Sequence, residues 1–85
     1  MANFKASVFV SLRPSVLDPA GEAAMSAAGR LGIEGIKKLR IGKSVSLEID
    51  ALDESEARQK IELLADRLLA NPVIEDWRFD LQTSA

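Results

Sequence analysis

The chain has 85 residues, a formal net charge of −2 and a sequence pI of about 5.0. This length predicts one domain over residues 1–85 with a thin core, because a chain of this size buries only about 60–65% of its unfolded surface. The acidic balance argues against a nucleic-acid partner, since such a surface needs a basic patch. No cysteine and no histidine is present, which excludes disulfides, thiolate metal sites and the commonest general base.

No apolar run in the sequence reaches the length of a membrane span. The first residues also lack the charged and then apolar pattern of a secretory signal. The sequence therefore predicts a soluble, cytoplasmic protein without a membrane partner.

Residues 4–12 alternate between apolar and polar side chains, which predicts a half-buried strand. The expected core positions of this strand are Phe4, Ala6, Val8, Val10 and Leu12. Phe9 breaks the alternation and is expected on the outer face. One exposed aromatic residue is often ordinary surface. On a small open sheet it is also a candidate contact with another chain.

A helix is predicted to begin at Pro19, because an aspartate cap (Asp18) followed by proline at the first helical position is a common start. Gly32 is expected to end it. The apolar positions at helical spacing form an alanine-rich stripe that is expected to pack on the sheet: Ala20, Ala23, Ala24, Ala27, Ala28 and Leu31.

The central residues 36–50 again alternate, with apolar side chains at odd-numbered positions on both sides of Gly42-Lys43. One interpretation is a hairpin with a three-residue loop at 42–44, which pairs Ile41 with Val45 and keeps one face apolar. In that interpretation Gly42 supplies a positive φ. The alternative is one long strand kinked at Gly42.

A second helix is predicted after Asp53, because Asp53 and Glu56 form a capping-box pattern. Asn71-Pro72 is expected to end this helix. A last strand is predicted over residues 73–81, with one apolar face. The residues expected in the core from these two elements are Ala57, Ile61, Leu64, Ala65, Leu68, Trp77, Phe79 and Leu81.

These elements predict an α+β fold of order β-α-β-β-α-β, with a mainly antiparallel four-stranded sheet and two helices on one face, as in ferredoxin-like proteins. Several unrelated functions share this order of elements. RNA-recognition modules carry aromatic residues on the third strand, and residues 44–50 contain none. Gly42-Lys43 lacks the second glycine and spacer of a phosphate loop. No catalytic, cofactor-binding or metal-binding residue is therefore predicted.

Four stretches resemble the PurS family, the small subunit of the multi-subunit phosphoribosylformylglycinamidine synthase: VFVSLRP, VLDPAGEA, LRIGKSVSLEID and LLANPVIEDWRFDL. Together they cover nearly the whole chain. The resemblance implies a non-catalytic accessory subunit of an ATP- and glutamine-dependent ligase of purine biosynthesis. Such a subunit would form a homodimer or a higher oligomer.

The resemblance further implies that the subunit bridges a glutaminase and a synthetase and assists ammonia transfer between them. ATP and magnesium would bind to the synthetase, and this chain would hold no cofactor. The candidate partner-interface residues are Phe9, Gly42, Lys43, Asn71 and Pro72. The alternative function is a small-molecule-binding regulatory domain of ferredoxin-like topology, which should contain an enclosed pocket with convergent polar groups.

Overall fold

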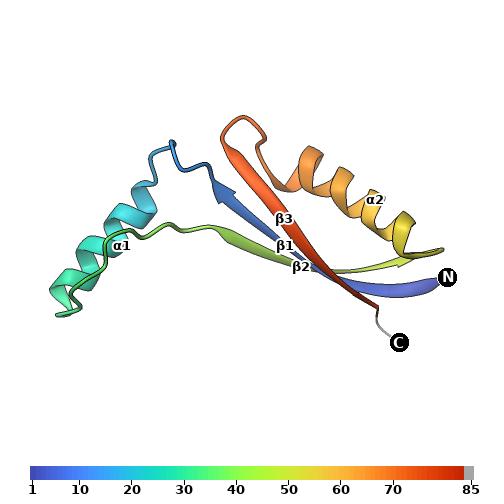
Figure 1. The fold of residues 1–85 in the computed structure, drawn as a ribbon, viewed down its shortest axis with the longest axis horizontal. Coiled ribbons are helices and arrows are strands. Elements are labelled where there is room, and N and C mark those ends of the chain that lie inside the picture. Colours follow the sequence, from blue (N-terminus) through green and yellow to red (C-terminus); the bar gives the residue numbers. More distant parts are fainter. Residues whose placement is uncertain (84–85) are drawn as a thin grey trace.

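The computed structural model describes residues 1–83, which form a three-stranded sheet, two α-helices and one π-helical turn (Figure 1). The elements in chain order are β1 (Ala2–Leu12), α1 (Pro19–Arg30), β2 (Lys43–Ala51), α2 (Glu54–Leu64), η1 (Ala65–Leu69) and β3 (Glu75–Thr83). The strand order is β2-β1-β3, and both neighbours run antiparallel to β1. The predicted class, an α+β fold with an antiparallel sheet and two helices, is confirmed.

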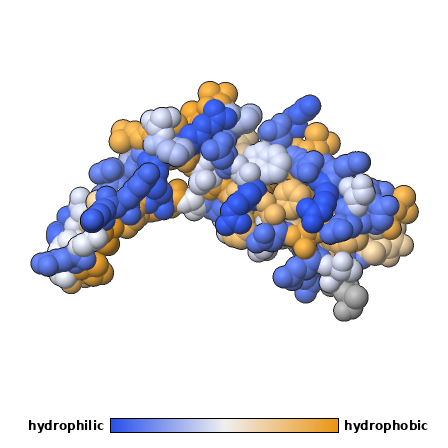
Figure 2. Space-filling model, in the orientation of Figure 1, coloured by the Kyte–Doolittle hydropathy of each residue, from blue (hydrophilic) through white to orange (hydrophobic). Residues whose placement is uncertain are grey.

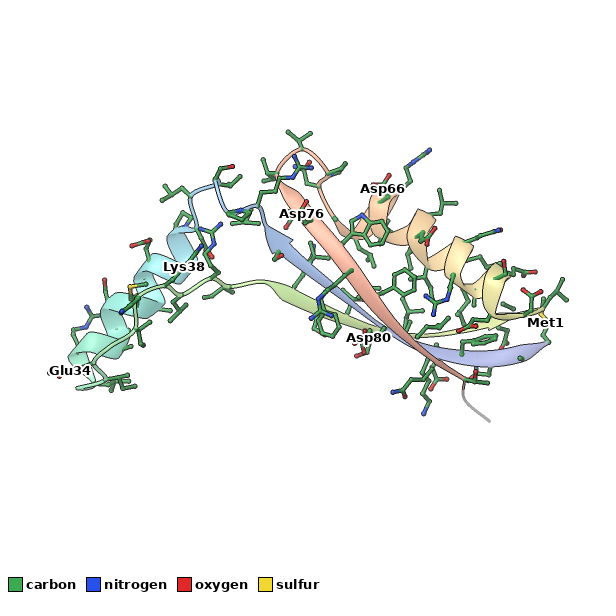
Figure 3. All side chains as sticks on the ribbon, in the orientation of Figure 1. Met1, Glu34, Lys38, Asp66, Asp76 and Asp80 are labelled. Carbon is green, nitrogen blue, oxygen red and sulfur yellow. The ribbon has the colours of Figure 1, made fainter. Side chains whose placement is uncertain are left out.

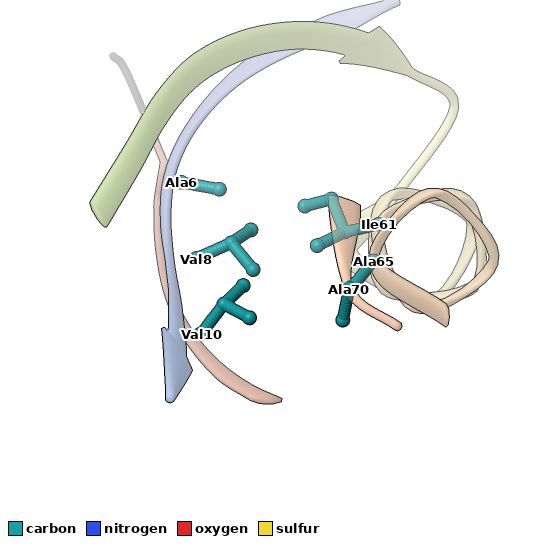
Figure 4. Close-up of a cluster of buried hydrophobic side chains, with 6 residues drawn as sticks. All are labelled: Ala6, Val8, Val10, Ile61, Ala65 and Ala70. Carbon is teal, nitrogen blue, oxygen red and sulfur yellow. The ribbon is translucent and has the colours of Figure 1, made fainter. Parts of the chain in front are cut away.

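The core lies between one face of the sheet and the helix α2. The odd positions of β2 and β3 meet the even positions of β1, so that Val8 lies opposite both Val45 and Phe79. This register places the apolar residues of all three strands on the same face. Figure 4 shows Val8 and Val10 of β1 facing Ile61 of α2 across this core. The predicted positions Ala57, Ile61 and Ala65 are completely buried.

The helix α1 does not pack on the sheet. Figure 1 shows it projecting from the end of β1, with residues 33–42 returning beside it. We call α1 together with residues 31–42 the arm. The arm gives the molecule an elongated shape, with principal extents of 51 × 29 × 15 Å. The opposite face of the sheet, which carries Lys5, Ser7 and Phe9, is not covered by either helix (Figure 1).

The arm corrects two details of the predicted fold. Residues 36–41 are extended but pair with no strand among residues 1–83, so the predicted hairpin and fourth strand do not form within the chain. The alternative of an extended run through Gly42 is closer to the structure. The two helices also do not share one face of the sheet. The expected buried alanine stripe is largely open, since Ala20 and Ala23 are exposed and Leu31 is 79% exposed.

The role predicted for Gly42 is also corrected. Among residues 1–83, the glycines with positive φ are Gly32 and Gly35. Gly42 is instead required by a close approach, because a Cβ atom there would lie 2.5 Å from the carbonyl oxygen of Val10. The chain therefore passes directly over the end of β1 at Gly42, and no turn forms there.

Candidate partner interface

The structure brings four of the five candidate residues to one end of the sheet, where β1 finishes. Lys43 lies opposite Val10 at the start of β2, and Gly42 immediately precedes it. Asn71 and Pro72 belong to the turn that leads into β3. They do not form one cluster, however, because Phe9 lies on the open face of the sheet and the other four residues lie at its end.

Phe9 is half-buried, and its ring is covered by the side chain of Arg78 from β3. The guanidinium carbon of Arg78 lies 4.3 Å from the ring centroid, which is the geometry of a cation–π contact. The two residues are directly opposite in the β1–β3 register. Phe9 is therefore on the outer face, as predicted, but much of its surface already contacts its own chain.

The turn at Asn71-Pro72 is ordered by polar contacts. The amide nitrogen of Asn71 donates to Oε1 of Glu75 at 2.7 Å, and Oδ1 of Asn71 accepts a hydrogen bond from the amide of Val73. Arg13 donates to the carbonyl oxygen of Pro72 and, at 3.2 Å, to Oδ1 of Asp76. The turn holds Val73 in solvent, with 76% of its surface exposed.

Arg13 was not among the predicted site residues. Its only signal in the sequence is its place before Pro14 at the end of an alternating strand. The residues that it reaches lie about sixty positions further along the chain. This contact therefore depends on the pairing of β1 with β3.

Asp18 joins the two chain segments that meet at the base of the arm. Its Oδ1 accepts a hydrogen bond from the amide of Gly21 at 2.9 Å, as expected for a helix cap. Its Oδ2 accepts another from the amide of Ile41 at 2.8 Å. The hydrogen bonds from the Ile41 and Gly21 amides favour the ionised carboxylate and lower the pKa of Asp18 below its ordinary value. The side chain is buried, with 4% of its surface exposed.

A second contact at the base of the arm comes from Arg40. Its guanidinium donates to the carbonyl oxygens of Arg13 and Val16, both at 2.8 Å. Asp18 and Arg40 thus tie the returning segment to the loop before α1. The sequence identified Asp18 as a cap but did not indicate these contacts across the arm.

Apolar side chains are exposed along the arm. Figure 2 shows hydrophobic surface toward its outer end. Exposed apolar clusters mark interaction surfaces more often than isolated apolar residues do. The large apolar side chains exposed on the arm and the loop before it are Leu17 (73%), Leu31 (79%), Ile33 (52%) and Ile41 (45%).

The described residues offer little for catalysis. No group of three metal-ligating side chains is present within residues 1–83, and no buried polar side-chain atom in this range lacks a hydrogen-bond partner. A hollow of about 530 Å³ lies on the uncovered face of the sheet. Its rim is formed by exposed side chains, including Lys5, Glu48 and Asp80, so it is not the enclosed pocket expected of a small-molecule-binding domain.

No helix within residues 1–83 combines the length and apolar character needed to cross a membrane. An antiparallel α+β domain that exposes large apolar side chains along an arm is typical of a protein that binds other chains.

The model of the PurS family, described as phosphoribosylformylglycinamidine (FGAM) synthase, matches residues 5–83. The chain belongs to this family.

Relatives with this name are similar over nearly the whole chain. The phosphoribosylformylglycinamidine synthase subunit PurS of Mycobacterium leprae is 50% identical over 74 residues, which are 86% of this chain and 89% of that protein. A chain in the structure of PurLQS from Thermotoga maritima is 33% identical with a TM-score of 0.89, and the match covers 96% of this chain and all of that one.

Another similar solved structure is that of a protein in the purine biosynthetic pathway. PurS of Methanocaldococcus jannaschii is described as one of the subunits of formylglycinamide ribonucleotide amidotransferase in the purine biosynthetic pathway. It is 29% identical with a TM-score of 0.84, over 96% of this chain and 99% of that one. The predicted resemblance and the predicted role as a subunit of this ligase are confirmed.

Proposed function

We propose that this chain is a non-catalytic, homo-oligomeric subunit of cytoplasmic phosphoribosylformylglycinamidine synthase. In this proposal it joins the glutaminase subunit to the synthetase subunit and assists the transfer of ammonia between them. ATP and magnesium bind to the synthetase. The presence of a PurS chain in the PurLQS structure of Thermotoga maritima supports the assignment of partners.

The proposal rests on two features of the structure. The carboxylate of Asp18 is buried and hydrogen-bonded within the chain, whereas large apolar side chains of the arm are exposed to solvent. Asp18 is the buried acidic residue of the described chain, and both of its oxygens accept backbone hydrogen bonds. It therefore acts as a structural group, which caps α1 and anchors the returning segment of the arm. Leu31 and Ile33 are left in solvent instead.

The chemistry of ammonia explains why such a subunit would matter. Free ammonia released into water at neutral pH is protonated and loses its nucleophilicity. An interface that excludes water keeps it reactive until it reaches the synthetase. A bridging subunit therefore contributes by closing the contact between two active sites, without supplying a reacting group.

The test is reconstitution with the separate glutaminase and synthetase subunits. Alone, this chain should hydrolyse neither glutamine nor ATP. Added to the other two, it should raise glutamine-dependent turnover strongly. Turnover with a high concentration of ammonium salt should respond much less, because ammonia from bulk solution bypasses the transfer. Equal dependence of both activities on this chain would mean that it shapes the synthetase site, and the transfer role would have to be abandoned.

Lys43→Glu tests whether the end of the sheet contacts a partner. Lys43 is exposed, so its replacement should change the free energy of unfolding by no more than about 0.5 kcal/mol. A partner contact there would weaken complex formation while ammonium-dependent activity remains. Glu62→Lys, at an exposed position of α2, is the control for a charge reversal elsewhere. An equal effect of both variants would exclude a specific contact at Lys43.

A further inference from the structure

Arg13 contacts the turn that leads into β3, residues 70–74, through both its backbone and its side chain. Its amide nitrogen donates to the carbonyl oxygen of Ile74 at 2.9 Å. Its guanidinium donates to the carbonyl oxygen of Pro72 and to Oδ1 of Asp76. Figure 3 shows Asp76 at the start of β3, where the chain leaves this turn. The position of the turn therefore depends on where Arg13 is held.

The arm in turn fixes the position of Arg13. The guanidinium of Arg40, on the returning segment of the arm, donates to the carbonyl oxygens of Arg13 and Val16, both at 2.8 Å. The amide of Val16 also donates to the carbonyl oxygen of Arg13, at 2.9 Å. Arg40 is only partly exposed, so water competes less for its hydrogen bonds than at a free surface. Arg13 is thus shared by two sets of contacts, one with the arm and one with the turn.

The π-helical segment η1 lies immediately before this turn and changes the direction of Leu68. The buried positions of α2 recur every four residues as far as Ala65, but the next buried residue is Ala70, five positions later. The amide of Ala70 donates to the carbonyl oxygen of Ala65 at 2.9 Å, which is the pattern of a π-turn. The extra residue turns Leu68, a predicted core residue, into solvent, where 73% of its surface is exposed.

We propose that Arg13 couples the arm to the turn before β3. Release of Arg40 from the carbonyl oxygen of Arg13 loosens the hold of Arg13 on the turn. Opening of the turn loosens the arm in return, because a coupling free energy between two sites is reciprocal. Local opening of the turn is the two-state element that the arm biases.

The consequence of this coupling rests on the proposed function. Leu31 and Ile33 are exposed on the arm, whereas Leu68 and Val73 are exposed beside and within the turn. Each pair is a candidate contact for another chain. In a subunit that joins two other chains, a partner that orders one of these regions would also order the other. Binding of the first partner would then favour binding of the second without a direct contact between them.

Amide hydrogen exchange in the isolated full chain tests the coupling from the arm to the turn. The variant is Arg40→Gln, and the reporting amides are those of Val73 and Glu75, which are hydrogen-bonded to Asn71. Their exchange rates should rise roughly fivefold, as expected when the closed turn loses the equivalent of one hydrogen bond. The amide of Glu56, bonded to the cap of α2, should keep its rate, which separates local coupling from a general loss of stability.

The matched control is Arg30→Gln, because Arg30 is an exposed arginine at the far end of α1. This variant should leave the exchange rates of the Val73 and Glu75 amides unchanged. No increase with Arg40→Gln, or an equal increase with both variants, overturns the coupling.

The reverse direction gives a second measurement. Asp76→Ala removes the ion pair with Arg13 and should raise the exchange rate of the Ile41 amide, which donates to Asp18 at the base of the arm, by a similar factor. Asp80→Ala is the control, because Asp80 is an exposed carboxylate of the same strand. An Ile41 amide that responds equally to both variants, or to neither, overturns the coupling.

Arg13→Gln tests whether Arg13 is the coupling residue. In this background, Arg40→Gln should no longer change the exchange rate of the Val73 amide, because the link between arm and turn is already broken. The side chain of Arg13 is 45% exposed, so its replacement should leave the fold intact. A persisting effect of Arg40→Gln would mean that another route joins the two regions, and the role of Arg13 would be overturned.

The coupling and the accessory role can fail separately. Exchange rates in the isolated chain decide the coupling, whatever the activity of the assembled complex. A chain with the expected exchange rates that does not support glutamine-dependent turnover contradicts the proposed function alone.

Discussion

The carboxylate of Asp18 accepts a hydrogen bond from the amide of Ile41, a residue 23 positions later in the chain. This contact joins the start of α1 to the end of the segment that returns from it. Because the same carboxylate also caps α1 through Gly21, one side chain holds both ends of the arm. Three predictions concern this base of the arm and the strand that it crosses, one concerns the open face of the sheet, and one concerns the core.

The first prediction concerns pH. The pKa of Asp18 lies below its ordinary value of 3.8, so in acid the unfolded chain binds a proton at this residue before the folded chain does. The ionised Asp18 side chain stabilises the folded state above pH 3.8. This contribution to the free energy of unfolding is lost as the pH falls from there through the lowered pKa. Asp18→Asn should flatten this part of the stability profile. Urea unfolding of both proteins between pH 2 and pH 7 measures it, and parallel profiles would contradict the role of Asp18.

The second prediction compares two caps. Asp18→Ala removes a cap and a contact across the arm, whereas Asp53→Ala removes only the cap of α2, a hydrogen bond to the amide of Glu56 at 2.8 Å. Loss of the α2 cap should cost about 1 kcal/mol. The loss at Asp18 should be larger, because the amide of Ile41 is left without its acceptor. The denaturant midpoints of the two variants measure both losses of stability. A smaller loss for Asp18→Ala than for Asp53→Ala would show that the arm does not depend on this contact.

The third prediction compares two glycines. Gly42→Ala should destabilise the protein by about 1–3 kcal/mol, because its Cβ atom would clash with the carbonyl oxygen of Val10. At Gly29 no atom lies within 4 Å of the position of a Cβ atom. Gly29→Ala should therefore stabilise α1 by about 0.5 kcal/mol. Thermal unfolding measures both. A neutral Gly42→Ala variant would mean that the chain does not pass so close to β1.

The fourth prediction concerns the contact between Phe9 and Arg78 on the open face of the sheet. A double-mutant cycle with Phe9→Leu and Arg78→Gln should give a coupling of about 0.5 kcal/mol, as expected for an exposed cation–π pair. If this face also contacts a partner subunit, Phe9→Leu should weaken the complex by more than it destabilises the chain. Zero coupling would mean that the two side chains do not stay stacked in solution.

The core provides a check on the fold itself. Ile61→Ala should cost about 3 kcal/mol, because Ile61 is completely buried between α2 and β1. Leu63, two residues later, is 58% exposed, and Leu63→Ala should change stability by no more than about 0.5 kcal/mol. Similar losses from both would contradict the packing of α2.

The sequence by itself determined the three strands of the sheet, because the alternation of β1, β2 and β3 specifies which residues face the core. It also determined the starts of both helices, since the caps Asp18 and Asp53 act on amides three residues away. Such signals are local, and local geometry is sufficient to interpret them. The family followed from the four stretches that carry the resemblance.

Only the tertiary structure decided the course of the arm. The alternation of residues 36–41 is equally compatible with a strand paired within the chain and with one left open, because periodicity specifies a face and not a partner. The contacts that decide between them join residues far apart in sequence, namely Ile41 with Asp18 and Gly42 with Val10. They keep the chain extended through Gly42, and the edges of β2 and of residues 36–41 remain open for this reason.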